Sequence, residues 1–497
     1  MNREASLARL RKEKFDLLVI GGGITGCGIA LDAAARGLRV GLIERGDFAA
    51  GTSSRSSKLI HGGLRYLRHF QFKVTLQASR EKSLLKRLAP HLVEDLPFVL
   101  PFWNPGARPA LAAGLWIYDA AAGFPKGLLH RHLNAREVQE FAPGILSEGL
   151  RGGYVYYDAK ADDCRLVLHV AKKAADLGAA MANYVEAIGF LKEKGRIVGV
   201  RTPHFDIAAA RVVNATGVWC DEVRAADDPG APPTVRPSKG VHLVCAARRL
   251  GISTALTLPA PEEGRVVFLI PWGDSVLVGT TDTEYAGPLD RPRAEPEDIQ
   301  YLLNRVNDLL PSAHLGPKDV RSTFAGLRPL LLAEDSTASS RVPREHRLFE
   351  SPSGLLSITG GKLTTYRKMA QEVVDRITGR PCRTAEIDLF ASEAKDPLSR
   401  LYGSEADLVG DRTPLEDGLG HVWGEVDYAL EREMAVTLTD VLARRMRLAI
   451  YAPDQGRSVA PEVAARMAAR LGWDRAEIFR QVEAYERELD ESYRRRA

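Results

Sequence analysis

Residues 15–45 read FDLLVIGGGITGCGIALDAAARGLRVGLIER, which joins a short apolar run, a cluster of glycines and an alanine-rich segment. Residues 15–20 predict a buried parallel strand, and residues 24–36 predict a helix. Residues 39–43 predict a second strand, which Glu44 ends. Strand, glycine turn, helix, strand and acidic residue, in this order, form the fingerprint of a dinucleotide-binding unit.

The glycines and the acidic residue each have a physical task in such a unit. Gly21 permits a tight turn, Gly23 lets the backbone approach a pyrophosphate, and Gly26 lets the helix pack closely against the strand. The N-terminus of the helix offers N–H groups and a partial positive charge to the phosphates. Glu44, 18 residues after Gly26, is placed to accept hydrogen bonds from an adenosine ribose.

The segment after Glu44 is strongly basic, although the chain as a whole carries 68 Lys and Arg against 64 Asp and Glu. Residues 48–80 contain no Asp or Glu, and they include TSSRSSK at 52–58 and LIHGGLRYL at 59–67. Cations about 4 Å apart repel each other by roughly 4 kcal/mol per pair at an effective dielectric of about 20. The cluster therefore indicates anionic ligands. Its hydroxyls and cations suit a diphosphate, and a loop in this position favours FAD over NAD.

The composition is that of a soluble globular protein of two or three domains, with 497 residues, 45% hydrophobic and 27% charged. A net charge of +4 does not indicate nucleic-acid binding. The five cysteines include no CxxC pair, so we expect neither a metal site nor a disulfide framework. The N-terminus lacks the apolar core of a secretory signal. The longest apolar-rich run, residues 110–123, contains Asp119 and is too short to span a bilayer.

We expect an α/β fold in which a discontinuous Rossmann-like cofactor domain is combined with an inserted antiparallel-sheet domain and a helical C-terminal domain. Alternating runs such as RVVFLIPWGDSVLVGTTDTEY predict the antiparallel strands, and the pattern after residue 385 is helical. The expected boundaries are 15–90, 160–224 and 321–380 for the cofactor domain, 91–159 and 225–320 for the substrate or cap domain, and 385–497 for the C-terminal domain.

Six segments together resemble one family of flavoproteins. They are, in order, GGGITGCGIALDAAARGLRV, TSSRSSKLIHGGLRYL, NATGVW, GTTDTEY, GLRPL and GGKLTTYRKMA. The chain resembles the FAD-dependent glycerol-3-phosphate dehydrogenases, the respiratory kind that reduces quinone, closely over 15–380 and more loosely beyond. The resemblance implies oxidation of sn-glycerol 3-phosphate to dihydroxyacetone phosphate, with hydride passing from C2 to flavin N5 and electrons then passing to a membrane quinone.

The resemblance also implies two groups of substrate-facing residues. Near the reacting carbon it places His61, Arg328 and Lys362. On the substrate phosphate it places three further residues, Arg65, Tyr66 and Arg344. A base with a pKa near neutral is wanted to take the hydroxyl proton, which favours His61 modestly over Lys362. Arg328 would polarise the developing carbonyl oxygen.

The expected contacts to FAD lie in four parts of the chain. No motif for a flavin–histidyl or flavin–cysteinyl bond is recognisable, so we expect non-covalent binding. The expected cofactor-binding residues are Gly21, Gly22, Gly23, Ile24, Thr25, Gly26, Glu44, Thr52, Ser53, Ser54, Ser57, Lys58, Leu59, His61, Gly62, Ala215, Thr216, Gly217, Gly361, Lys362, Leu363 and Thr364.

Three other functions stay open at this stage. One is an oxidase of the same substrate that passes electrons to oxygen. A second is an amino-acid or amine oxidase of the same flavoprotein superfamily, which would have a less cationic pocket. A third is a non-enzymatic flavin-binding scaffold, which would leave His61, Arg328 and Lys362 without a task.

Two segments are candidates for contact with a membrane surface, where a quinone resides. Residues 107–132 combine Trp116, Ile117 and leucines with nearby basic side chains, and residues 3–14 form a second basic candidate. The alternative is that the first is core and the second a solvated helix. We expect a cytoplasmic protein with the option of peripheral attachment to the inner face of the cell membrane, no nucleic-acid partner, and a homodimer as one option for its assembly.

Overall fold

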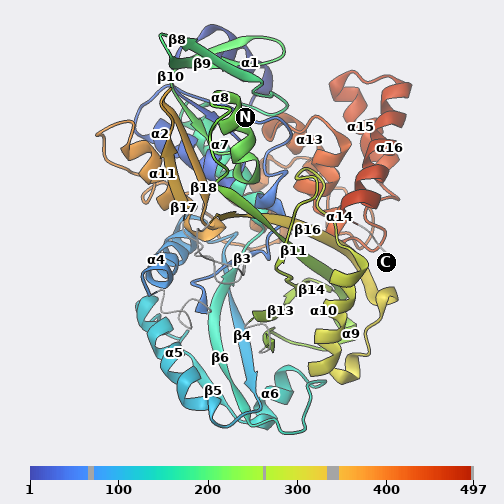
Figure 1. Cartoon of the computed structure of the whole chain (residues 1–497). Helices are drawn as coiled ribbons and strands as arrows, with labels where there is room; N and C mark the ends of the chain where they lie inside the picture. Colours follow the sequence, from blue (N-terminus) through green and yellow to red (C-terminus); the bar gives the residue numbers. More distant parts are fainter. Residues whose placement is uncertain (65–71, 261–264, 333–345, 494–497) are drawn as a thin grey trace.

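The structure is a computed structural model that describes residues 1–64, 72–260, 265–332 and 346–493. Figure 1 shows one sheet with its helices in the upper half, a second sheet in the lower half, and the C-terminal helices beside them. Arg65, Tyr66 and Arg344 lie outside the described residues. The expected fold class, an α/β fold with a helical C-terminal domain, is confirmed.

The upper sheet has eight strands, with the order β17-β18-β10-β1-β2-β7 and the antiparallel pair β8–β9 extending from β10. β1 lies at its centre because it pairs in parallel with β2 on one side and β10 on the other. The strands are β1 (Phe15–Ile20), β2 (Val40–Ile43), β7 (Ala180–Ala182), β8 (Gly189–Glu193), β9 (Arg196–Arg201), β10 (Asp206–Asn214), β17 (His346–Glu350) and β18 (Leu355–Gly360).

Helices pack against this sheet. The α2 helix is almost entirely buried because it lies between the sheet, α7 and α11. After the glycine pair at 360–361, the chain forms a 3₁₀ turn (Leu363–Thr365) that leads into the α-helix at Tyr366–Asp375. The helices are α1 (Arg3–Lys12), α2 (Ile24–Ala35), α7 (Asp163–Asp176), α8 (Cys220–Asp227) and α11 (Tyr366–Asp375).

The lower sheet has ten strands, with the order β15-β11-β14-β13-β12-β4-β6-β3, and with β16 paired to β11 and β5 to β6. Its strands are β3 (Leu59–Ile60), β4 (Glu94–Phe102), β5 (Arg131–Leu133), β6 (Gly152–Lys160), β11 (Val235–Ala246), β12 (Ala255–Ala260), β13 (Arg265–Trp272), β14 (Ser275–Gly279), β15 (Thr283–Glu284) and β16 (Val320–Leu331). Its helices are α5 (Ala107–Ala121), α6 (Ala135–Phe141), α9 (Ala247–Leu250) and α10 (Pro296–Leu309). Helix α4 (Phe72–Leu88) contacts α5 but buries Leu85 and Leu88 in the core of the upper sheet.

The sequence pattern placed two segments in the cofactor domain that form strands of the lower sheet in the structure. β3 pairs with β6, and β16 pairs along its length with β11. An alternating strand pattern records which face is buried, whereas the partner strand is chosen by contacts far away in the chain. This pairing matters for the site because β16 carries Arg328 and β3 leads directly into His61.

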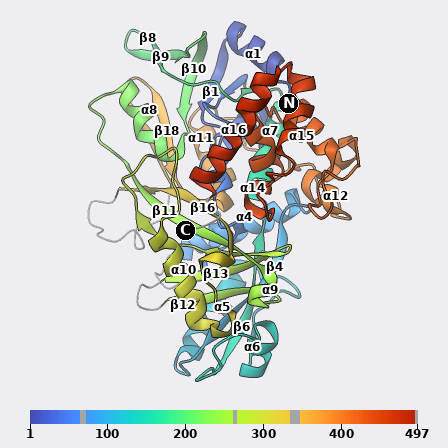
Figure 2. The same cartoon turned by 90° about the vertical axis from the view of Figure 1, so that its right-hand side faces the viewer.

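The C-terminal part is helical, with α12 (Pro397–Tyr402), α13 (Trp423–Arg432), a π-helical turn (Asp440–Arg445), α14 (Leu448–Tyr451), α15 (Ala460–Leu471) and α16 (Arg475–Ser492). Figure 2 shows α14 and α16 near β16, and the π-helical turn contacts α7. Residues of α13, α14, α15 and α16 share one apolar core with the lower sheet, whereas Leu398 and Tyr402 of α12 belong to a smaller separate cluster. Over the described ranges, no helix combines the length and the apolar character needed to cross a bilayer.

Candidate active site

A cavity of about 1410 Å³ is lined by residues of both sheets. That volume exceeds the roughly 300–1,000 Å³ of ordinary ligand pockets, so it leaves room for a large cofactor and a small substrate together. One part of the lining is the turn between β1 and α2, and another is formed by β11, β16 and the loop after β18. Helix α5 contributes apolar residues to a third part.

The glycine turn has the shape that a dinucleotide requires. Gly21 has a φ of +114°, and a Cβ there would lie 2.7 Å from the carbonyl oxygen of Ala215. A Cβ on Gly26 would lie 1.9 Å from the Gly21 carbonyl oxygen, so only glycine lets α2 start so close to the turn. The backbone of Gly23 remains exposed to the cavity, and the N–H of Ile24 donates to Ser53 Oγ at 3.0 Å.

Glu44 lines the cavity at the end of β2. Its carboxylate accepts the N–H groups of Gly22 at 2.6 Å and Gly46 at 2.8 Å. Burial raises the pKa of Glu44, and these two hydrogen bonds oppose the rise. Each carboxylate oxygen can accept more than one hydrogen bond, so Glu44 retains the capacity to bind ribose hydroxyls. The donors of the turn, the hydroxyls of the following loop and this acid together fit FAD.

Most of the predicted site residues line this one cavity, although they come from distant parts of the chain. The lining includes Gly21, Gly23, Ile24, Thr25, Glu44, Thr52, Ser53, Ser57, Leu59, His61, Ala215, Thr216, Gly217, Arg328, Gly361, Lys362, Leu363 and Thr364. Five predicted cofactor contacts do not line it, and they are Gly22, Gly26, Ser54, Lys58 and Gly62.

Lys58 points away from the cavity. Its ammonium is fully buried, where it pairs with Asp163 at 2.9 Å and donates to the carbonyl oxygen of Ser54 at 3.2 Å. Burial lowers the pKa of Lys58, and the positive charge of Arg447 lowers it further. The expectation that Lys58 binds the cofactor is therefore corrected for its side chain: it holds the 52–58 loop onto α7 through Asp163.

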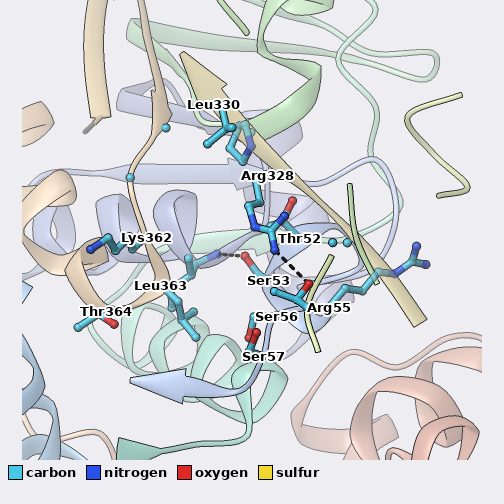
Figure 3. A pocket seen from close by; sticks show the side chains of 18 of the residues that line it. Thr52, Ser53, Arg55, Ser56, Ser57, Arg328, Leu330, Lys362, Leu363 and Thr364 are labelled. Carbon is cyan, nitrogen blue, oxygen red and sulfur yellow. Dashed lines mark hydrogen bonds between the residues drawn. The ribbon is translucent and has the colours of Figure 1, made fainter. Parts of the chain in front are cut away.

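Arg328 extends from β16 into the cavity and is held in one orientation by the turn that follows β14. Its Nη2 donates to Thr280 Oγ1 and to the Thr281 carbonyl oxygen, both at 3.1 Å, and it pairs with Asp282 at 3.4 Å. A Cβ on Gly240 would lie 2.4 Å from Nη2, so that glycine makes room for the guanidinium. Figure 3 shows Arg328 near Thr52 and Ser53, with Lys362, Leu363 and Thr364 to one side.

His242 is a cavity residue that the sequence analysis missed. It lies on β11, its ring stacks on Phe324 with centroids 4.7 Å apart, and its Nε2 lies 2.8 Å from Ser57 Oγ. Its Nδ1 has no hydrogen-bond partner among the described residues. Burial, followed by the charges of Arg328 and Lys58, lowers the pKa of His242 to about 3, so the ring is neutral at neutral pH.

The signal that could have found His242 was the glycine two residues before it. Gly240 and His242 lie on the same face of a strand because side chains alternate across a sheet. A glycine in the middle of an apolar strand marks a close approach of another group, which is here Arg328. The histidine by itself was uninformative, because a lone histidine in a strand is usually a structural residue.

Comparisons with known proteins identify the family. A family model described as FAD dependent oxidoreductase matches residues 16–367, and one described as the C-terminal domain of alpha-glycerophosphate oxidase matches residues 355–478. The glycerol-3-phosphate dehydrogenase of Mycobacterium leprae is 38% identical, over 97% of this chain and 89% of that protein. The aerobic glycerol-3-phosphate dehydrogenase of Bacillus subtilis is 35% identical, over 95% and 94%.

A solved structure gives the same result for the fold and the cofactor. The glycerol-3-phosphate dehydrogenase of Bacillus halodurans, complexed with FAD, superposes with a TM-score of 0.82 at 31% identity, over 98% of this chain and 97% of that one. Together with the donor set of the cavity, these likenesses show that the chain is an FAD-dependent oxidoreductase and belongs to the glycerol-3-phosphate dehydrogenase family.

Proposed function

We propose that the protein oxidises sn-glycerol 3-phosphate to dihydroxyacetone phosphate with non-covalently bound FAD and passes the electrons to a membrane quinone. The observation that carries this proposal is a single cavity lined both by the dinucleotide turn and by His61, His242, Arg328 and Lys362. The names of the relatives, which match over nearly the whole chain, support the substrate.

The cofactor would be held by backbone and short side chains. The Gly21–Gly23 turn and the start of α2 would receive the pyrophosphate, the hydroxyl of Ser53 would add a donor, and Glu44 would take the ribose. The Thr52 hydroxyl instead donates to the Leu327 carbonyl oxygen at 2.6 Å and ties this loop to β16. When bound, FAD supplies the acceptor for the hydride that leaves C2 of the substrate. The apolar lining from α5 would keep water away from this end of the cavity.

The substrate hydroxyl would be oriented by Arg328 and deprotonated by a neighbouring base. Arg328 is already fixed by Thr280, Thr281 and Asp282, so it can stabilise charge on the oxygen without reorganising. His61 is the preferred base and Lys362 the alternative. His242, with a pKa near 3, is a poor base at neutral pH, and its Nε2 is engaged with Ser57 Oγ, so it would help to hold the 52–58 loop beside the site.

The substrate phosphate would be bound by Arg65, Tyr66 and Arg344, as the family resemblance implies. An arginine fork matches phosphate better than a point charge does. Arg65 and Tyr66 follow His61 closely in the chain, so the segment that carries the base would also carry the phosphate ligands.

Electron transfer to quinone would take place at a surface next to α5. Trp116 is 55% exposed and Phe124 is 53% exposed, which is unusual for side chains of this size. Other residues of the same helix, such as Ala110 and Gly114, line the cavity. A helix with an exposed apolar side and a cavity-lining side suits a protein that lies on a membrane and takes a lipid-soluble acceptor.

The test is anaerobic mixing of the FAD-loaded protein with sn-glycerol 3-phosphate while the visible absorption of the flavin is followed. We expect the flavin to bleach, with sn-glycerol 1-phosphate and a panel of amino acids as controls. Bleaching by an amino acid and not by glycerol 3-phosphate would refute the proposed substrate. Fast reoxidation by oxygen, with peroxide formed at the rate of turnover without quinone, would refute the quinone part and favour the oxidase.

A further inference from the structure

A buried polar group lies behind the loop that carries His61. Asp158, at the end of β6, receives hydrogen bonds on its Oδ1 from the Tyr118 hydroxyl at 2.5 Å and from Lys82 Nζ at 2.9 Å. The N–H of Gly62 donates to Tyr118 Oη at 2.9 Å and to the same Asp158 oxygen at 3.2 Å. Residues of α4, α5 and β6 thus converge on one peptide group, the one that joins His61 to Gly62.

The burial of this group makes its hydrogen bonds energetically important. Tyr118 is 1% exposed, Asp158 5% and Lys82 6%. Asp158 also borders the cavity, but Tyr118 and Lys82 do not, so these two have no bulk water as an alternative partner. Burial, followed by the charge of Asp158, raises the pKa of the Tyr118 hydroxyl well above its usual value, so it stays a proton donor. A buried donor left without a partner is costly, and Gly62 therefore stays where Tyr118 and Asp158 hold it.

Gly62 is also held by close packing. A Cβ at this position would lie 2.5 Å from Ser79 Oγ and 2.7 Å from Tyr118 Oη. The backbone of the loop is therefore pressed against the two helices, and it has little room to shift toward them. The hydrogen bonds from the Gly62 N–H to Tyr118 and Asp158 restrain movement of the loop away from these helices.

We propose that Tyr118 is a positioning residue for the catalytic loop: through the Gly62 N–H it fixes the direction in which His61 enters the cavity. The proposal rests on the proposed function only in taking His61 as the base or as a substrate contact. Tyr118 lies on α5, whose exposed side carries Trp116. The Tyr118 hydroxyl therefore links α5, the helix proposed to face the membrane, to the loop that carries His61.

The decisive variant is Tyr118→Phe, which removes one oxygen atom and keeps the ring. Its matched control is Tyr154→Phe. Tyr154 lies on β6, is 4% exposed, and also uses its hydroxyl to contact α5, at the Arg108 carbonyl oxygen 3.4 Å away. It does not line the cavity. Both variants lose a tyrosine hydroxyl between β6 and α5, but only one loses a contact with the loop.

In anaerobic stopped-flow experiments we expect Tyr118→Phe to slow flavin reduction at saturating glycerol 3-phosphate about tenfold or more. Its FAD content and the substrate concentration at half-saturation should change less than about twofold, and Tyr154→Phe should behave as wild type. Wild-type rates in Tyr118→Phe would overturn the proposal. Equal slowing in both variants would also overturn it, because the effect would then belong to the attachment of α5 in general.

Hydrogen exchange of the FAD-loaded protein without substrate provides a second readout that does not depend on the substrate. We expect faster exchange in the peptide that covers residues 59–64 in Tyr118→Phe and not in Tyr154→Phe. Unchanged exchange there would refute the restraint on Gly62. If wild type is not reduced by glycerol 3-phosphate, the proposed function fails, while this measurement still decides whether Tyr118 restrains the loop. Asp158→Asn should accelerate exchange in the same peptide if Tyr118→Phe does not fold.

Discussion

The roles of similar side chains in this protein are decided by the partners that each finds. Lys58 and Lys362 both lie in segments with the family pattern, yet Lys58 is buried against Asp163 whereas Lys362 lines the cavity. A buried ammonium needs a carboxylate because its desolvation is otherwise too costly. Both lysines have the same residue type and lie in segments with the family pattern. The sequence therefore could not show that only one of them faces the cavity.

Substitutions in the reacting group should separate binding from chemistry. We expect His61→Asn to lower the rate of flavin reduction by roughly 10²-fold or more, because loss of a general base typically has an effect of that size. Lys362→Met should also lower this rate, and it should have the larger effect of the two if Lys362 is the base. Arg65→Ala should mainly raise KM, because the phosphate contact proposed for Arg65 would be present both before and during the reaction. Rapid-reaction measurements of rate against substrate concentration check this. Equal effects of all three variants on both parameters would contradict the roles.

The glycine turn should not tolerate even a methyl group. In Gly26→Ala the new Cβ would lie 1.9 Å from the Gly21 carbonyl oxygen, so either α2 or the turn must move. We expect the purified variant to contain little or no FAD, as measured by absorbance after gel filtration. The control is Gly379→Ala, where a Cβ meets nothing within 4 Å. Normal FAD content in Gly26→Ala would mean that the close approach is not required.

At the scale of elements, α5 shows how one helix can serve several surroundings. Tyr118 and Leu115 are buried, Trp116 is exposed, and Ala110 and Gly114 line the cavity. The sequence left two alternatives for this segment, core or membrane surface. The helix has a buried face and a face that exposes Trp116, because successive residues of a helix point about 100° apart.

Removing the exposed aromatic groups near α5 should weaken membrane binding without affecting the chemistry. Burial of a large apolar side chain contributes roughly 1.5–3 kcal/mol, so the double variant Trp116→Ser, Phe124→Ser should bind anionic phospholipid vesicles at least tenfold more weakly in a sedimentation assay. Anaerobic flavin reduction should be unchanged. Phe479→Ser is the control, because Phe479 is 65% exposed on α16. Equal loss in the control, or no loss in the double variant, would count against a membrane surface at α5.

A histidine pair between α7 and the loop after α4 should make the fold sensitive to acid. His169 Nδ1 donates to the Arg165 carbonyl oxygen, so its Nε2 accepts the Nε2–H of His91, 3.3 Å away. Burial, followed by the charge of Lys172, lowers the pKa of His91 to about 4. Both rings are therefore neutral in the folded protein near pH 7.

Because the pKa of His91 is depressed in the folded state, the unfolded state binds more protons as the pH falls below about 6.5. The stabilisation is complete above that pH and is lost between about pH 6.5 and pH 4, by up to about 3 kcal/mol from His91. We expect the free energy of unfolding of His91→Gln to depend less on pH in this window than that of wild type, in urea titrations at several pH values. Parallel curves would show that His91 titrates normally.

At the scale of the whole molecule, the C-terminal helices are fastened to the cofactor side by buried arginines. Arg445 pairs with Asp47, in the loop after Glu44, and Arg447 donates to Asp163 at 3.0 Å and to the Ser54 carbonyl oxygen at 2.9 Å. Burial would raise the pKa of Asp163, but the charges of Lys58 and Arg447 hold it below its usual value. The C-terminal part of the chain therefore contacts both the loop after Glu44 and the 52–58 loop.

Breaking this centre should affect stability and cofactor retention together. Asp163→Asn removes the ion-pair partner of buried Lys58, and breaking a buried pair in this way typically costs about 3–5 kcal/mol. Arg447 keeps Asp162 at 3.6 Å, but Ser56 loses its hydrogen bond to the carboxylate. We expect unfolding at a lower urea concentration and faster loss of FAD, followed by flavin fluorescence. Glu13→Gln, which breaks the half-exposed pair with Arg9, should change stability by less than about 1 kcal/mol. If Asp163→Asn is as stable as wild type, the pairing of Asp163 with the buried cations does not stabilise the fold.

The sequence alone was sufficient for the elements whose geometry depends on near neighbours. The turn at Gly21, the helix at 24–35 and the acid at Glu44 lie within thirty residues of each other. The residue types in this short stretch are enough to predict all three. The same locality allowed the fold class and the cofactor to be predicted. The family resemblance then indicated Arg328 and Lys362, which the structure brings into the lining of the same cavity.

Only the tertiary structure decided which strands pair and which side chains face the cavity. β16 joins β11, His242 enters the site, and Lys58 turns to Asp163, each through a partner more than seventy residues away in the chain. The pattern of a strand records that one face is buried but not what buries it. Long-range pairing is chosen by the total packing and electrostatic energy of the folded chain, which no local stretch of sequence contains.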